Sequence, residues 1–207
     1  MKVLLFNGSP HEKGCTATAL AEMETRLHEH GIETERFYIG TSPVASCTAC
    51  GACGKIAKCV FNDLVNDFGE KAKTADGFVF GSPVYYASPS AQCLSFMDRL
   101  FFAYGKVFDG KPGCAVVSCR RGGASAAFDV LNKYFLMNNM PVVPSQYWNQ
   151  VHGSTPDDVK KDAEGLQTMR TLADNMAWMI KSFAAAKAAG IDKPQREPVQ
   201  RTNFIRG

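Results

Sequence analysis

The sequence of 207 residues lacks several features that would assign it to a class of proteins. It has no apolar stretch near the ~20 residues of a membrane span, and the apolar start 1–6 is too short for a secretory signal. Lys and Arg number 23 against 20 Asp and Glu, and a net charge of +3 is too weak to favour a nucleic-acid partner. No repeat or low-complexity segment is present. These absences predict a cytoplasmic, globular protein without a membrane or nucleic-acid partner.

Several catalytic and nucleotide-binding patterns are also missing. The loop 8–16 has neither the GxGxxG spacing of a dinucleotide fold nor the GK[ST] of a P-loop. No Ser-His-Asp order and no paired carboxylates stand out. The sequence therefore does not favour a dinucleotide fold, a P-loop NTPase or a hydrolase.

Cysteine, in contrast, is abundant. The chain has eight cysteines, and four of them lie between positions 47 and 59. In a reducing compartment such a group favours a metal or redox site over structural disulfides.

Apolar runs and helical spacings alternate along the chain. This alternation predicts an α/β fold with a parallel sheet and helices on both faces, in a domain of residues 1–188 with a cysteine-rich loop at 43–62. The polar segment 189–207 is expected to be a solvated tail or an arm on a neighbouring subunit, the latter favoured by Phe204-Ile205 at its tip. Strands are expected at 3–6, 33–39 (near an edge), 77–80, 114–118 and from 142, and helices around 20–27, 94–101, 128–135 and from 155 to 183.

Three loops follow the strands at 3–6, 77–80 and 114–118. Loop 8–16 leads into a helix and carries hydroxyls, which suits a phosphate, although an ordinary turn fits equally. Tyr85 and Tyr86 could face a planar ring or close the edge of the core. The loop 119–124 combines arginines and glycines, which could meet a polar ring edge or be a solvated turn. Because parallel sheets bind ligands at the carboxyl ends of their strands, the three loops together predict a mononucleotide with a planar head.

These loops carry a family resemblance over roughly residues 1–185. Asn-Gly-Ser-Pro with Gly-Cys-Thr, Gly-Ser-Pro-Val-Tyr-Tyr with Ser-Ala-Gln and Phe-Met-Asp-Arg, and Arg-Arg-Gly-Gly are similar to motifs of the NADPH-dependent FMN reductases in the flavodoxin-like superfamily. The resemblance implies a doubly wound, five-stranded parallel sheet of order 2-1-3-4-5 that binds FMN.

The resemblance also implies a role for each loop. His11 and Cys15 stand where the family often has Arg and Asn or Ser, which would shift the phosphate site toward backbone contacts. Tyr85 and Arg121 are candidates for tuning the flavin. The phosphate would contact Ser9, His11, Cys15, Thr16 and Ala17; the isoalloxazine Pro83, Val84, Tyr85 and Tyr86; and its pyrimidine edge Cys119, Arg120, Arg121, Gly122 and Gly123.

The cysteine group has the spacing C-x2-C-x2-C-x5-C, formed by Cys47, Cys50, Cys53 and Cys59. Its fourth cysteine could serve the same centre as the others, unlike that of bacterial ferredoxins. The spacing resembles the motif of iron–sulfur flavoproteins, a branch of this family with a [4Fe–4S] cluster, and the likeness returns at 202–206. Free or disulfide-forming thiols and structural zinc are the alternatives, although zinc sites usually divide their ligands into two distant pairs.

The remaining cysteines are expected to fill space, and Cys15 or Cys119 would be reactive only if a helix N-terminus lowered its pKa. The sequence as a whole predicts an FMN-dependent oxidoreductase with NAD(P)H or a ferredoxin-type donor, as a homodimer or homotetramer. The alternatives are a flavin/iron–sulfur electron carrier, of a type less acidic than flavodoxin, and a cysteine-based redox sensor without a cluster.

Overall fold

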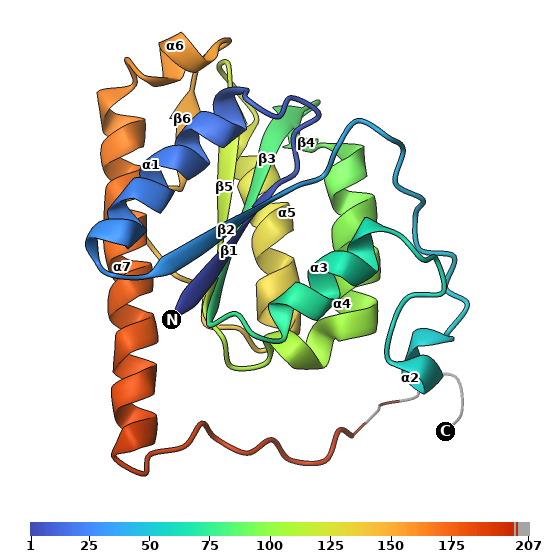
Figure 1. The fold of residues 1–207 in the computed structure, drawn as a ribbon. Helices are drawn as coiled ribbons and strands as arrows, with labels where there is room; N and C mark the ends of the chain where they lie inside the picture. The colour runs from blue at the N-terminus through green and yellow to red at the C-terminus, as the bar shows by residue number, and fades with distance from the viewer. Residues whose placement is uncertain (201, 203–207) are drawn as a thin grey trace.

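The computed structural model describes residues 1–200 and 202, and it has one central parallel sheet (Figure 1). Its strands follow the order β2-β1-β3-β5-β6, which confirms the predicted 2-1-3-4-5 arrangement. A short strand β4 (Ser88–Pro89) is additional and pairs antiparallel with β3. The five parallel strands are β1 (Lys2–Asn7), β2 (Glu33–Tyr38), β3 (Gly77–Tyr85), β5 (Gly113–Cys119) and β6 (Gln150–His152).

Helices cover both faces of the sheet, as predicted (Figure 1). Side chains alternate along a strand, so Leu4 and Phe6 face one core while Val3 and Leu5 face the other. The first core is rich in phenylalanine and lies under α3 (Leu64–Ala72), α4 (Ala91–Phe108) and α5 (Ala124–Met137). The second lies under α1 (Cys15–Glu29) and α7 (Ala163–Ala188), and two single-turn helices, α2 (Cys53–Ile56) and α6 (Pro156–Val159), complete the set.

Four details of the predicted elements were wrong or missing. Strand β3 does not stop at 80, because Gly81, Ser82 and Pro83 still pair with β5. Val142 forms only an isolated bridge with Gly113, and the regular last strand is β6. The final helix is divided in two, because Asp162 caps a new helix by accepting from Gly165 N. Helix α3 had not been predicted.

The chain beyond α7 runs as an exposed segment without regular structure from 191 to 200. Lys193 and Arg196 both form ion pairs with Asp109, at the end of α4. Arg201, Arg206 and the tip Phe204-Ile205 lie outside the described residues. Within the part of the chain that is described, no helix is long and apolar enough to cross a membrane.

Candidate functional site

The loops after β1, β3 and β5 contact one another at the carboxyl edge of the sheet. Gly8 N donates to Gly81 O across 2.8 Å, which joins the first loop to β3. The hydroxyls of Thr16 and Ser118 lie 2.8 Å apart and join the start of α1 to β5. The three loops singled out in the sequence are therefore one continuous surface.

The first loop is shaped by its own side chains and leaves the start of α1 without a side-chain cap. Asn7 Oδ1 accepts from Ser9 N, and Ser9 Oγ accepts from His11 N, each at 3.1 Å. Gly14 is the N-cap of α1 and offers no side-chain acceptor to the first turn. Uncapped N–H groups at a helix start favour an anion. Thr16 is buried and its hydroxyl is engaged by Ser118, so its contribution to such a site would come from its backbone.

The second loop is a tight hairpin formed by β3 and β4. Its two turn residues, Tyr86 and Ala87, have φ of 50° and 57°, the left-handed values of a type I′ turn. Such values cost non-glycine residues on the order of 1–3 kcal/mol each and concentrate at functional sites. The Tyr86 side chain is fully exposed and Tyr85 is 44% exposed. The alternative in which both tyrosines close the core edge is therefore wrong.

The third loop packs directly against this hairpin. Gly123, at the start of α5, has a φ of +89°, and a Cβ there would lie 2.7 Å from Ala87 Cα. A close approach of this kind requires glycine. Arg120 and Arg121 are exposed beside it, where they can turn toward a ligand.

The cysteines near these loops are not activated thiols. Burial raises the pKa of both Cys15 and Cys119, outweighing backbone hydrogen bonds that lower it. Burial also raises the pKa of Cys93 to about 12 and that of Cys114 further. The expectation that these four cysteines fill space agrees with these shifts.

A fourth segment at this edge was missed in the sequence. Cys15 Sγ lies 3.6 Å from Gly153 O, which places the segment after β6 beside the start of α1. Tyr38 also donates to Pro10 O across 2.7 Å from the end of β2. Gly153 was overlooked because the last strand was expected from 142, although the Thr155-Pro156 helix start shortly after it was a usable signal.

The four cysteines of the loop 43–62 line one pocket of about 110 Å³. Ala49, Gly51 and Ala57 adopt positive φ and turn the chain sharply around it. Cys47 and Cys50 are exposed, whereas Cys53 and Cys59 are half-buried. The predicted grouping of these cysteines is thus present in the structure.

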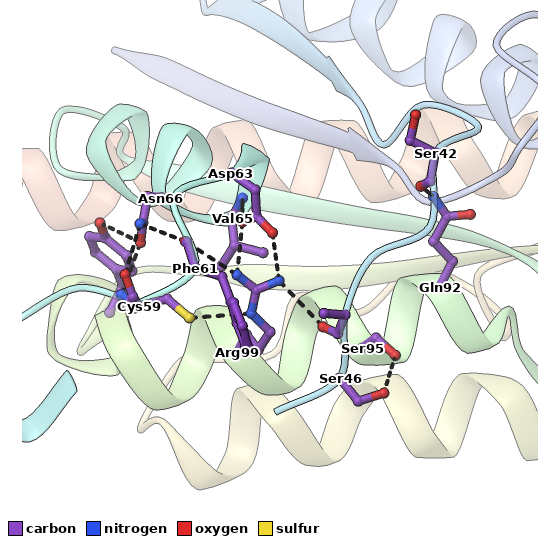
Figure 2. Close-up of polar contacts among 12 residues, drawn as sticks. Ser42, Ser46, Cys59, Phe61, Asp63, Val65, Asn66, Gln92, Ser95 and Arg99 are labelled. Carbon is purple, nitrogen blue, oxygen red and sulfur yellow. Dashed lines mark hydrogen bonds and ion pairs between the residues drawn. The ribbon is translucent and has the colours of Figure 1, made fainter. Parts of the chain in front are cut away.

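Arg99 of α4 adjoins this pocket and was not predicted to be part of it. Its Nε lies 3.2 Å from Cys59 Sγ, and its terminal nitrogens bind the Asp63 carboxylate at 2.7 and 2.8 Å (Figure 2). Burial opposes the charged guanidinium, but the hydrogen bonds to Asp63 and Cys59 outweigh it and raise the pKa of Arg99.

Asn66 of α3 fixes the backbone of Cys59. Its Oδ1 accepts from Cys59 N at 2.9 Å, and its Nδ2 donates to Cys59 O at 3.0 Å (Figure 2). Of the residues that the structure describes, no three His, Cys, Asp or Glu are placed to ligate a single metal ion.

A model of the NADPH-dependent FMN reductase family matches residues 1–154. The chain belongs to this family. It is accordingly a flavin-dependent oxidoreductase, and FMN is the family's cofactor.

Two relatives of the chain are named iron–sulfur flavoproteins. An iron–sulfur flavoprotein of Methanocaldococcus jannaschii is 34% identical over 189 residues, which cover 87% of this chain and 98% of that protein. An iron–sulfur flavoprotein of Methanosarcina thermophila is 30% identical over 186 residues, with 87% and 96% covered. The branch that the cysteine spacing resembled is thereby confirmed.

A solved structure has a similar fold. The crystal structure of RosB with a bound flavin intermediate superimposes with a TM-score of 0.70, covering 99% of this chain and 92% of RosB. The two sequences are only 16% identical, so the likeness concerns the fold alone.

Proposed function

We propose that the chain binds FMN at the carboxyl edge of the sheet and transfers electrons from NAD(P)H or a ferredoxin-type donor to an acceptor in the cytoplasm. The observation that carries this proposal is the mutual contact of the three loops, above all Gly123 against Ala87 of the tyrosine hairpin. FMN, when bound, supplies hydride and single-electron chemistry, and the protein supplies position and electrostatics.

Each loop has a proposed part in holding the flavin. The start of α1 would hold the phosphate mainly through backbone N–H groups, with Ser9 and His11 beside it. Tyr85 and Tyr86 would lie against the isoalloxazine, together with Pro83 and Val84. The loop Cys119 to Gly123 would meet the pyrimidine edge, where the positive charge of Arg121 would balance negative charge on the reduced ring.

We propose further that Cys47, Cys50, Cys53 and Cys59 hold a [4Fe–4S] cluster. Their position around one pocket and the description of the two relatives as iron–sulfur flavoproteins support this. The cluster would exchange single electrons with the flavin. No residue of the chain needs to act as a general acid in this scheme.

Two other functions each have an observation in their favour. Cys47 and Cys50 are exposed, as the thiols of an oxidation sensor would be. A dedicated electron carrier would share both cofactor sites, and the +3 charge excludes only the strongly acidic flavodoxin type.

We also propose that the chain assembles as a homodimer or homotetramer through the face of α4 and α5. Phe102, Leu136 and Met137 are each more than two-thirds exposed there, beside an apolar groove of about 520 Å³. Phe102 also lines the cysteine pocket, so a second copy on this face would shield that pocket from water. Met137→Lys should reduce the oligomer mass measured by light scattering, whereas Trp178→Lys on α7 should not. Equal masses for both variants would rule out this face.

The enzymatic function is tested by rapid mixing of the flavin-loaded protein under anaerobic conditions. Bleaching of the flavin by NADPH or NADH, followed by turnover with an electron acceptor, is the expected result. Bleaching by reduced ferredoxin alone, without turnover, would favour the carrier. Absence of bound flavin would contradict the proposal.

A further inference from the structure

We propose that Arg99 is a positioning residue of the cysteine site, which donates a hydrogen bond to Cys59 and raises the reduction potential of the cluster. This inference rests on the proposed iron–sulfur function of the four cysteines. It concerns a residue of α4 that lies outside the cysteine motif and that neither the family match nor the relatives' descriptions assign to a role.

The guanidinium of Arg99 is buried and fully engaged. Its side chain is 1% exposed, and it has five N–H donors in a planar fork. Nε donates to Cys59 Sγ, and both terminal nitrogens donate to Asp63. The remaining contacts are to the carbonyls of Ala45 at 3.3 Å and Phe61 at 3.4 Å. A lysine has three donors on a flexible stem and cannot reproduce this set.

These contacts close the cysteine segment at both ends. Ala45 precedes Cys47, and Phe61 follows Cys59, so one side chain holds the chain before and after the four cysteines. The Phe61 ring also lies 4.8 Å from the Arg99 guanidinium carbon and covers it.

Other residues of α4 attach the same loop to the same helix face (Figure 2). Gln92 donates to Ser42 O at 2.8 Å, and the hydroxyls of Ser95 and Ser46 lie 3.0 Å apart. Gln92, Ser95 and Arg99 follow helical spacing, so they project in nearly one direction. Arg99 is the member of this row that reaches a sulfur.

Arg99 and Asp63 should shift the reduction potential of the cluster in opposite directions. A hydrogen bond to a ligand sulfur stabilises the more negative, reduced state and raises the potential. Asp63 accepts hydrogen bonds from Arg99 at both carboxylate oxygens, so its negative charge partly cancels the positive charge of Arg99. The Asp63 side chain is 33% exposed. Loss of Arg99 should therefore lower the potential, whereas loss of the Asp63 charge should raise it.

The test is an anaerobic redox titration of the cluster-loaded protein in four variants. Arg99→Gln should shift the reduction equilibrium toward the oxidised cluster by about tenfold, which for one electron is about 59 mV. Asp63→Asn should shift it in the opposite direction and keep the α3 cap, because Asn caps helices as well as Asp. Arg99→Gln with Asp63→Asn removes both charges and avoids leaving a half-buried carboxylate without its ion-pair partner. Arg170→Gln, whose partner is Glu22 on the opposite side of the sheet, is the control.

A second readout does not need the loaded cluster. Hydrogen exchange at the Cys59 amide in the metal-free protein should become at least tenfold faster in the double variant than in wild type, and should be unchanged in Arg170→Gln.

The outcomes separate this inference from the proposed function. A wild-type protein without iron would overturn both. A wild-type protein with a cluster whose potential is unaffected by Arg99→Gln and by Asp63→Asn would overturn only the role of Arg99. Shifts of the same sign in Arg99→Gln and Asp63→Asn would also overturn it, because a general loosening of the loop gives no reversal. If Arg99→Gln does not fold, Asp63→Asn alone decides by the sign of its shift.

Discussion

Arg99 Nε donates a hydrogen bond to Cys59 Sγ across 3.2 Å, although 40 residues separate them in the sequence. Arg99 lies in the middle of α4, and the N-cap of the same helix is Ser90, whose hydroxyl donates to Gly8 O in the first loop at 2.9 Å. Nine residues of helix span roughly 14 Å. One rigid element thus holds both the proposed flavin edge and the cysteine pocket.

The first prediction concerns the exposed ring of Tyr86. Tyr86→Gly relieves the left-handed φ of 50° and should raise the free energy of unfolding by up to about 1 kcal/mol. The same change removes a ring proposed to lie on the flavin, so FMN binding measured by flavin fluorescence should weaken by at least about tenfold, or 1.4 kcal/mol.

The matched control for Tyr86 is its neighbour in the turn. Ala87→Gly relieves a φ of 57° and removes only one methyl group. It should stabilise the protein similarly while leaving FMN affinity within about twofold, or 0.4 kcal/mol. Equal losses of affinity in both variants would point to turn geometry rather than the ring.

A second prediction compares two adjacent glycines. Gly123→Ala places a Cβ at a φ of +89° and 2.7 Å from Ala87 Cα, so it should cost at least about 1–2 kcal/mol of stability and weaken FMN binding. A Cβ at Gly122 meets nothing within 4 Å and has no positive φ, so Gly122→Ala should leave the thermal stability unchanged. Thermal unfolding of the pair gives the result, and equal losses of stability would refute the proposed loop contact.

A third prediction concerns the support of Cys59 by Asn66. Asn66→Ala leaves the N–H and the carbonyl of Cys59 without their partner and removes one of the donors to Phe61 O; each group left unsatisfied away from water costs about 1–3 kcal/mol. Iron content should fall while FMN content is retained. Asn175→Ala, which loses one exposed bond to Pro144 O, is the control. Unchanged iron in Asn66→Ala would show that this support is dispensable.

A fourth prediction concerns the pH dependence of the ion pairs that Lys193 and Arg196 form with Asp109. Lys193 first, and then Asn139, hold the pKa of Asp109 below its ordinary value of 3.8. A lowered pKa means that the stabilisation is present above 3.8 and is lost as the pH falls through the lower folded value. At pH 6, the free energy of unfolding measured in urea should be about 0.2–1 kcal/mol higher for wild type than for Asp109→Asn. The difference should vanish near pH 2–3, and a constant difference would exclude this cause.

The sheet was predictable because its central strands are short, continuous apolar runs in the sequence. The runs at 3–6, 77–80 and 114–118 are almost entirely apolar, as is typical of strands covered on both faces. The last strand was not predictable, because Gln150–His152 is short and mixes polar and apolar residues. It is recognised by its pairing with β5 rather than by its own composition.

The three flavin loops were found because each follows a recognisable strand. The left-handed turn at Tyr86 was not predicted, since tyrosine and alanine do not favour a type I′ turn, and its packing against Gly123 is visible only in the folded chain. Arg99 was missed for a similar reason: a local motif identifies ligands, whereas a hydrogen bond across 40 residues depends on the folded chain.

The central claim is that one chain holds both a flavin and an iron–sulfur cluster, and the cofactor content of anaerobically purified protein tests it directly. The account predicts about one FMN and about four iron atoms per chain. It also predicts that Cys53→Ser lowers the iron content while FMN remains. A protein that carries FMN with one zinc ion per chain, or with no metal, would contradict the cluster, and a colourless protein without flavin would contradict the account as a whole.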